Sequence, residues 1–273
     1  MKGIIKKLLR AYYRYKQVKM WKREMLIESE KIKPDITIKQ QIDGRCLVLI
    51  PHSDDEWIGC SRIVEKGKDV ILCNMDMCGG DTPALHYERF EEMSLVAQDN
   101  GRSIITIKEN KTEELKKVII EIKPDYVFLP HFIDWHPEHI EVMNILNKAI
   151  CDMDLNNVQF HVVQFQVSCP IIRGITHALA MSEGEWKQKW AYFRSHYPSQ
   201  VHIPYQRFSL NEIINGRYID AYAAEVYCVM NTSDWIKYYN NNMVTEKQIQ
   251  ELRNCLGSIC SMRHYIRNEY SNA

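Results

Sequence analysis

The chain alternates between short, almost continuous apolar runs and longer stretches in which apolar residues recur with helical spacing. The apolar runs are rich in β-branched residues and predict strands at 46–51, 69–75, 103–107, 126–130, 160–168 and 225–230. The stretches between the early runs predict helices at 56–67, 87–100, 112–122 and 137–149. Strands that are apolar throughout and separated by helices indicate a mostly parallel sheet covered on both faces. We therefore expect an α/β fold of the three-layer, Rossmann-like sandwich type.

Less regular patterns follow the predicted sheet. Residues 170–222 show no clear period, and we expect loops and short elements there that build a pocket wall. Thr245 and Gln248 then form a capping-box pattern, after which apolar residues recur at helical spacing as far as Ile266. This pattern predicts a C-terminal helix that packs on the domain. We assign residues 41–273 to a single α/β domain and residues 1–40 to a basic amino-terminal extension.

The amino-terminal segment is basic and amphipathic. Its first 23 residues hold nine Lys or Arg and no acidic residue. On a helical wheel one side carries Ile4, Ile5, Leu8, Leu9, Tyr12 and Tyr15. The other side carries Lys2, Lys6, Arg10 and Arg14. Such a helix can lie in a membrane interface, here through residues 1–24, and a helix that packs on its own domain or on a second subunit fits the pattern as well.

Composition and charge narrow the class of protein. The chain has 273 residues, of which 45% are hydrophobic and 26% charged, which are ordinary values for a globular protein. Its formal net charge of zero gives no general attraction to nucleic acid. The nine Cys are scattered without a CxxC pair, which indicates a reducing compartment. No secretory leader or spanning segment is evident, so we expect a cytoplasmic protein, peripheral on the inner membrane face if the basic helix binds lipid.

Polar side chains follow two of the predicted strands, at the point where each strand ends. His52, Asp54 and Asp55 come directly after the first strand. The second cluster lies within residues 130–139 and contains His131, Asp134, His136, Glu138 and His139. Ligands of open α/β sheets bind beyond the carboxyl ends of the strands, and imidazole with carboxylate is a usual ligand set of catalytic zinc. The two clusters together predict a metal site, in which one adjacent acid holds the metal and the other acts as a base.

Each of these residues also has a plain structural interpretation. Asp54 or Asp55 could cap the helix that begins near Glu56. His136 could be a surface residue beside Pro137. The metal interpretation depends on both strand ends at once, because a structural explanation has to account for each of them separately.

In these motifs the sequence resembles the LmbE-like family, also called the PIG-L de-N-acetylase family. The first family motif, a strand followed by His-Pro-Asp-Asp-Glu, reads His52-Ser53-Asp54-Asp55-Glu56. The later motif, Asp-x-His-Pro-Asp-His, reads Asp134-Trp135-His136-Pro137-Glu138-His139. Arg89 and Glu92 match an Arg-x-x-Glu pattern of the family, and Ser199-Gln200 is similar to a Ser-Gln pair. The resemblance runs from about residue 45 to about residue 230 and does not cover the basic amino-terminal segment.

The members of this family are zinc-dependent hydrolases that remove acetyl groups from N-acetylglucosamine-type sugars, including lipid-linked and thiol-linked ones. The resemblance implies that His52, Asp55 and His139 bind one Zn²⁺ per chain. It implies Asp54 as general base and His136 as the electrophilic or acid partner, with Arg89 near the substrate. The expected substrate is an N-acetylated amino sugar, such as a lipid-linked or surface-glycan precursor. The alternatives are a different amide, such as a thiol-sugar conjugate, and a sugar-binding protein without catalysis.

Further candidates flank the two motifs. Trp57 and Trp135 could stack on a sugar ring, although aromatic residues at strand ends more often pack in the core. We expect Asp134 to accept a hydrogen bond that orients His136 or His139.

Several features are left open by the sequence. Ser53 and Glu138 replace the usual Pro and Asp of the family, and neither is a ligand in the implied scheme. The cysteines at 60, 73 and 78 lie near the same sheet edge, where inert buried thiols are commoner than zinc ligands. Iron and cobalt accept the same ligand set as zinc, so the metal of the cell and the oligomeric state stay open.

Overall fold

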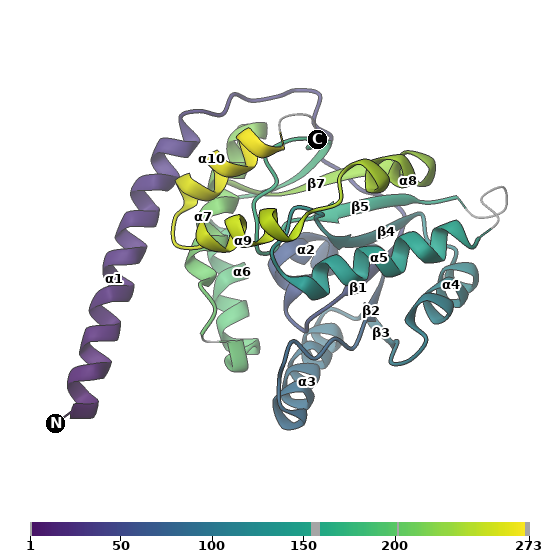
Figure 1. The fold of residues 1–273 in the computed structure, drawn as a ribbon, viewed down its shortest axis with the longest axis horizontal. Coiled ribbons are helices and arrows are strands. Elements are labelled where there is room, and N and C mark those ends of the chain that lie inside the picture. Colours follow the sequence, from purple (N-terminus) through teal and green to yellow (C-terminus); the bar gives the residue numbers. More distant parts are fainter. Residues whose placement is uncertain (1, 154–158, 201, 271–273) are drawn as a thin grey trace.

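The computed structural model describes the backbone of residues 2–153, 159–200 and 202–270, and side chains from residue 9 onward within these ranges. Its strands form one sheet in the order β3-β2-β1-β4-β5-β7-β6 (Figure 1). The strands are β1 (Arg45–Ile50), β2 (Asp69–Asn74), β3 (Ser103–Thr106), β4 (Tyr126–Pro130), β5 (His161–Phe165), β6 (His177–Met181) and β7 (Ala223–Asn231). Strands β1 to β5 are parallel, and β7 is antiparallel to both β5 and β6.

Helices cover both faces of this sheet (Figure 1). The helices of the first half are α1 (Lys2–Ser29), α2 (Asp55–Lys66), α3 (Pro83–Asp99), α4 (Lys111–Ile122) and α5 (Pro137–Cys151). Those of the second half are α6 (Glu183–His196), α7 (Tyr205–Gly216), α8 (Thr232–Asn241), α9 (Glu246–Asn254) and α10 (Ile259–Glu269). Short 3₁₀ turns, η1 (Pro198–Gln200) and η2 (Arg217–Ile219), flank α7. None of the helices in the described ranges combines the length and the hydropathy needed to cross a membrane.

The central strands divide their side chains between two apolar cores. Leu47 and Leu49 of β1 pack with α4, α5 and α8, whereas Val48 and Ile50 pack with α2, α3 and α6. All four side chains are fully buried. Side chains of a strand point alternately to opposite faces, so a strand covered on both faces is apolar at every position. The predicted three-layer α/β sandwich is thereby confirmed.

The region 170–222 is more ordered than the sequence indicates. It contains β6, α6 and α7 rather than only loops and short elements. Helix α7 turns polar residues inward, among them the buried Arg207, Asn211, Glu212 and Asn215. These polar residues share the buried side of the helix with Phe208, Leu210 and Ile214, so the apolar period in the sequence is weak.

The predicted C-terminal helix is interrupted. Helix α9 ends at Asn254, and α10 starts at Ile259 after a turn that includes Gly257. Ser258 caps α10, because its side chain accepts a hydrogen bond from the backbone N–H of Ser261 at 3.0 Å. The capping box of Thr245 and Gln248 is present at the start of α9.

The carboxyl half of α1 packs on the domain. Trp21 forms one apolar cluster with Leu210 and Ile214 of α7 and with Ile259 of α10. The indole N–H of Trp21 also donates a hydrogen bond to the carbonyl of Gly257 at 2.8 Å. This half of α1 is therefore held by both burial and hydrogen bonding, whereas the amino half extends beyond the domain (Figure 1).

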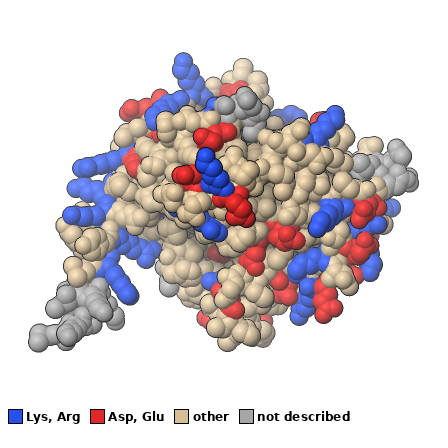
Figure 2. Space-filling view, viewed as in Figure 1, with Lys and Arg blue, Asp and Glu red and all other residues tan. Residues whose placement is uncertain are grey.

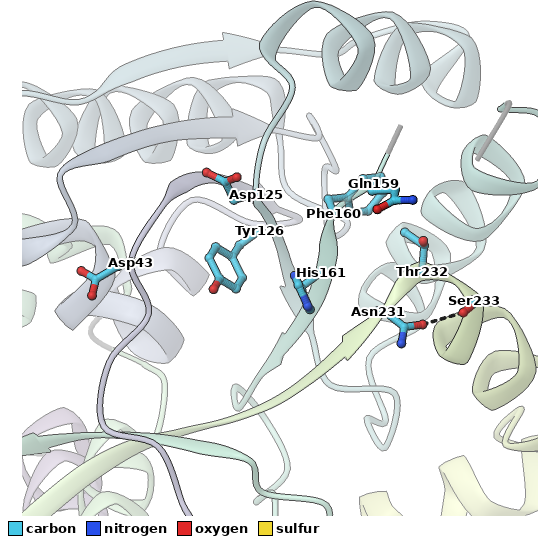
Figure 3. A pocket seen from close by; sticks show the side chains of 9 residues that line it. All are labelled: Asp43, Asp125, Tyr126, Gln159, Phe160, His161, Asn231, Thr232 and Ser233. Carbon is cyan, nitrogen blue, oxygen red and sulfur yellow. Dashed lines mark hydrogen bonds between the residues drawn. The ribbon is translucent and has the colours of Figure 1, made fainter. Parts of the chain in front are cut away.

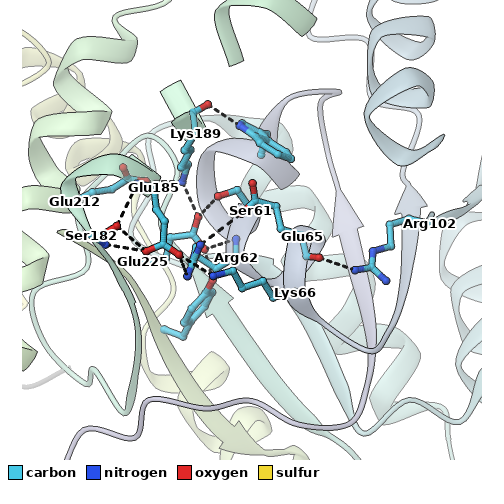
Figure 4. Close-up of polar contacts among 12 residues, drawn as sticks. Ser61, Arg62, Glu65, Lys66, Arg102, Ser182, Glu185, Lys189, Glu212 and Glu225 are labelled. Carbon is cyan, nitrogen blue, oxygen red and sulfur yellow. Dashed lines mark hydrogen bonds and ion pairs between the residues drawn. The ribbon is translucent and has the colours of Figure 1, made fainter. Parts of the chain in front are cut away.

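A buried ion cluster joins α2 to α6, α7 and β7. The ammonium group of Lys189 lies between the carboxylates of Glu212 and Glu225 (Figure 4). It donates to Glu225 at 2.6 Å and to the carbonyl of Ile58 in α2 at 2.9 Å. The hydroxyl of Ser61, also in α2, donates to the same oxygen of Glu225 at 2.6 Å. Since α2 begins at Asp55, the cluster fixes the helix that carries the first polar motif.

We predict that Lys189→Met lowers the free energy of unfolding by about 3–5 kcal/mol, because two carboxylates then remain buried without a counter-charge. The matched control is Lys187→Met on the same helix, whose exposed ammonium group pairs with Glu183 at 2.6 Å. An exposed pair of this kind contributes at most about 1 kcal/mol. Chemical denaturation of both variants measures the difference, and equal losses would contradict a stabilising role for the buried cluster.

Candidate active site

The two polar motifs meet where the order of the strands reverses. Strands β1 and β4 are parallel neighbours, with Leu47 paired to Val127, and β2 and β3 lie on the other side of β1. The chain leaves β1 through residues 51–54 into α2, and leaves β4 through residues 131–136 into α5. Both loops therefore emerge at the same edge, at the switch point where ligands of open α/β sheets bind.

Local hydrogen bonds fix the first loop. The backbone N–H of His52 donates to Asp55 at 3.0 Å, and the N–H of Asp54 donates to the carbonyl of His52 at 2.8 Å. Asp54 stands at the N-cap position of α2 but makes no capping hydrogen bond with its side chain. The carboxylate of Asp54 instead borders the cavity described below, so capping does not explain this residue.

The second loop is fixed by Asp134 and His136. Asp134 accepts from the backbone N–H of His136 at 2.8 Å. His136 caps α5, because its Nδ1 accepts from the N–H of Glu138 at 3.4 Å. A neutral imidazole that accepts at Nδ1 carries its proton at Nε2. Burial, together with the neighbouring His139 and His52, lowers the pKa of His136 to about 4, which favours this neutral form.

Three side chains converge on one point. Nδ1 of His52 lies 3.2 Å from Oδ2 of Asp55, and Nε2 of His139 lies 3.3 Å from each of these two atoms. In a tetrahedral zinc site with bonds of about 2.0–2.1 Å, ligand atoms stand about 3.3–3.4 Å apart. The triangle of donor atoms thus has the size that a tetrahedral metal site requires.

Carboxylates hold the outer sides of both imidazoles. Nε2 of His52 lies 2.6 Å from Glu138, and Nδ1 of His139 lies 3.0 Å from Asp134. Metal-binding histidines commonly donate their second N–H to a carboxylate in this way. If both ring protons point outward, two nitrogen lone pairs and the oxygen of Asp55 face one another, and only a cation at the centre can relieve their repulsion.

The same convergence attracts a proton. Burial lowers the pKa of His52, but hydrogen bonds with Asp55 and Glu138 outweigh it and raise the pKa to about 9. Burial likewise opposes the charged form of His139, and the charges of Asp134 and Asp55 raise its pKa well above the usual value. Strong attraction of positive charge is what a cation site requires, so the residues fit a metal ion.

His136 stands slightly outside this triangle. One ring nitrogen from each of His52, His136 and His139 lies within 4.8 Å of the others, and the rings of His52 and His136 are 4.5 Å apart. The more compact set is the one with Asp55. His136 therefore lies beside the triangle rather than within it.

Asp54 precedes Asp55 in the chain and is buried, and it lines the cavity described below. Burial raises its pKa well above the usual value, and the charge of Asp55 adds to this effect. Glu56 holds the loop in place by accepting from the backbone N–H of Asp54 at 3.1 Å and from the hydroxyl of Tyr197. Burial raises the pKa of Glu56 to about 7. Sequence reasoning assigned no role to Glu56, although it belongs to the first motif.

A cavity of about 580 Å³ opens from this cluster. His52, Asp54, Asp55, His136 and His139 line its inner end together with Arg89 and Trp135. Its outer walls come from distant segments, namely Gln17 and Trp21 of α1, Arg207 and Phe208 of α7, and Leu256 and Gly257 beyond α9. Sequence reasoning missed these outer residues because nothing local marks them.

The remaining predicted residues divide into those in the cavity and those outside it. Arg89 lines the cavity and pairs with Asp81 at 2.5 Å. Glu92, three residues on, accepts from the backbone N–H of Ser199 at 2.8 Å, so the two weaker family matches are joined. Trp57 does not fit the expected sugar contact, because it is buried in the core and stacks on Tyr192 at 4.2 Å.

His131 and the cysteines, to which the sequence analysis gave no role in the site, lie outside the triangle. His131 is buried and accepts from the backbone N–H of Ile133, and burial lowers its pKa to about 3. All nine cysteines are free thiols. Cys60 and Cys73 are buried in the two apolar cores, whereas Cys78 is exposed.

A second cavity, of about 670 Å³, lies at the opposite end of the sheet (Figure 3). Asp43, Asp125, Tyr126 and His161 line it near the amino ends of β4 and β5. The carboxylate of Asp125 is already engaged there, because it accepts from the backbone N–H of Arg45 at 2.7 Å. Within the described residues, metal-ligating side chains converge at the carboxyl end of the sheet and not here.

Solved structures share this fold. The conserved protein TT1542 from Thermus thermophilus is 17% identical, with a TM-score of 0.55 over 67% of this chain and 93% of that one. N,N′-diacetylchitobiose deacetylase from Pyrococcus horikoshii is also 17% identical, with a TM-score of 0.56 over 75% of this chain and 89% of that one. No protein-family model matches the sequence. At this identity the likeness shows the fold, and the chain spans nearly the whole length of both proteins.

We predict that Glu138→Ala weakens binding of a divalent metal about 10- to 100-fold, because His52 loses the carboxylate that orients its ring. Glu141→Ala on the same helix is the control, since Glu141 is exposed and accepts a hydrogen bond from Asn144 at 3.2 Å. Equilibrium dialysis against Zn²⁺ with metal analysis gives both affinities. Equal affinities for the two variants would exclude Glu138 from the metal site.

Proposed function

We propose that the protein is a zinc-dependent hydrolase that removes the N-acetyl group from an N-acetylglucosamine-type sugar. The observation that carries the proposal is the compact triangle of His52, Asp55 and His139 beside the carboxylate of Asp54. The structural likeness to a diacetylchitobiose deacetylase supports the same reaction class. The cavity volume of about 580 Å³ lies within the ~300–1,000 Å³ range of small-molecule sites.

In this proposal the side chains have distinct roles. His52, Asp55 and His139 hold the metal, which when bound lowers the pKa of a water toward ~7 and polarises an amide carbonyl. Asp54 accepts the proton of the attacking water. The Nε2–H of His136 donates a hydrogen bond to the amide oxygen as negative charge develops there.

The leaving amine needs a proton when the C–N bond breaks. Asp54 is suited to return the proton it has taken from the attacking water, because the same carboxyl group can act first as a base and then as an acid. Asp134 keeps His139 oriented through its hydrogen bond at 3.0 Å, and Trp135 and Arg89 border the space for the sugar. The products are acetate and a free amino sugar.

We further propose that the sugar belongs to a lipid-linked or surface-glycan precursor. In this proposal the protein is cytoplasmic and lies on the inner face of the membrane. Free thiols at all nine cysteines fit a reducing compartment. The alternatives are a different amide, such as a thiol-sugar conjugate, and a sugar-binding protein without turnover. Changing the acyl group and the sugar independently in a substrate panel separates them.

We predict that Asp54→Asn lowers kcat for acetate release about 100- to 10,000-fold while the variant still binds one metal ion per chain. His139→Ala is expected to lose both the metal and the activity, because it removes a metal ligand. Asp152→Asn, an exposed change at the end of α5, is the control and should leave both unchanged. The substrates are N-acetylglucosamine, N,N′-diacetylchitobiose and lipid-linked N-acetylglucosamine, with and without a chelator.

The outcomes of this experiment separate the metal site from the proposed hydrolysis. Metal binding without acetate release by the natural sequence would retain the metal site and favour another amide or a binding role. Activity that survives both the chelator and Asp54→Asn would rule out metal-dependent hydrolysis with Asp54 as the base.

A further inference from the structure

The described part of α1 has two faces with different surroundings. Val18, Trp21 and Met25 lie in the apolar cluster with α7 and α10. Leu9 and Tyr12 fall on roughly the opposite side, and Tyr15 lies between the two sides, since successive helical residues turn by about 100°. These three side chains are 48%, 51% and 64% exposed. The domain therefore does not cover the apolar stripe that the sequence displays, of which Ile4, Ile5 and Leu8 lie outside the described side chains.

Basic residues lie among these exposed apolar side chains. Lys16, Lys19 and Arg23 are exposed on the same side of the helix, and the ammonium group of Lys16 lies 4.6 Å from the ring centre of Tyr12. We call this surface the outer face of α1, which comprises Leu9, Tyr12, Tyr15, Lys16, Lys19 and Arg23. No acidic residue occurs in the first 23 positions, and basic side chains gather along α1 at the left of Figure 2.

We propose that the outer face of α1 docks the protein on a bilayer surface that carries anionic lipids. Tyrosine suits the boundary between headgroups and acyl chains, because one end of its ring is apolar and the other polar. Lysine and arginine can rest their apolar stems there while their charges meet lipid phosphates. A second copy of this chain is a poorer partner, since two such faces would bring like charges together.

The docking surface and the cavity share one helix. Gln17 and Trp21 line the outer wall of the cavity, on the side of α1 that faces away from the outer face. An α-helix with its side chains is about 10–12 Å across. Docking through the outer face would thus hold the cavity about one helix diameter from the lipid surface. The docking itself is independent of the proposed hydrolysis and is measured without any substrate.

The test is co-sedimentation of the full chain with two kinds of vesicle. Phosphatidylcholine vesicles that contain phosphatidylglycerol should bind the protein, and pure phosphatidylcholine vesicles should not. Added salt should weaken the binding, because it screens surface charges. Each basic residue at the surface strengthens binding roughly fivefold, so Lys16→Gln with Lys19→Gln should weaken it about 25-fold.

Matched variants separate the outer face from net charge. Lys237→Gln with Lys247→Gln changes the charge equally on exposed parts of α8 and α9 and should bind as the natural sequence does. Leu9→Ser with Tyr12→Ser should weaken binding without a change in charge. Failure to bind the anionic vesicles, or equal weakening by both lysine pairs, would overturn the proposal. Light scattering that shows a dimer lost in the Leu9→Ser, Tyr12→Ser variant would assign the face to a second copy instead.

Discussion

The parallel pairing of β1 with β4 is the constraint on which the site depends. It brings two loops, separated by about eighty residues in the chain, to one edge of the sheet, and each loop continues into a helix that is anchored in a different core. His52 comes from the first loop, Asp55 from the first position of α2 and His139 from α5, so no single segment could form the triangle alone. A one-residue slip of this pairing would turn the buried side chains of either strand to the wrong face and separate the ligands.

Around this pairing, the structure keeps the site rigid with charged groups rather than with apolar packing alone. Lys189 with its two carboxylates clamps the carbonyl of Ile58, and Glu56 holds the backbone of Asp54. Such buried ionic groups add little net stability compared with apolar residues of the same volume, but they have strict geometric demands. The ligand atoms of the nearby site stand about 3.3 Å apart, and the buried ionic groups help to hold the backbone in the position that this spacing requires.

The sequence predicts the central sandwich and the two motifs well because both are local signals. Apolar runs such as 46–51 need no partner to be recognised, and His52 to Asp55 are adjacent in the chain. The outer cavity could not be predicted, since Trp21, Arg207 and Leu256 meet only in the folded chain. Helix α7 was not predicted because polar and apolar residues alternate on its buried side, and the break before α10 depends on one turn around Gly257. The sequence left both packing and sugar contact open for Trp57, because the tyrosine on which it stacks is more than a hundred residues away.

Helix α1 lies between the cavity, which Trp21 and Gln17 line, and the outside of the protein. The helix meets the cavity on one side and the surroundings of the protein on the other, and its apolar contacts with the domain come from its carboxyl half. If docking on lipid changes the affinity of the cavity for its ligand by some factor, occupancy of the cavity changes the affinity for lipid by the same factor, because the linkage between two binding equilibria is reciprocal. The segment with the least family resemblance is thus the part of the chain through which occupancy of the cavity and attachment of the protein can be thermodynamically coupled.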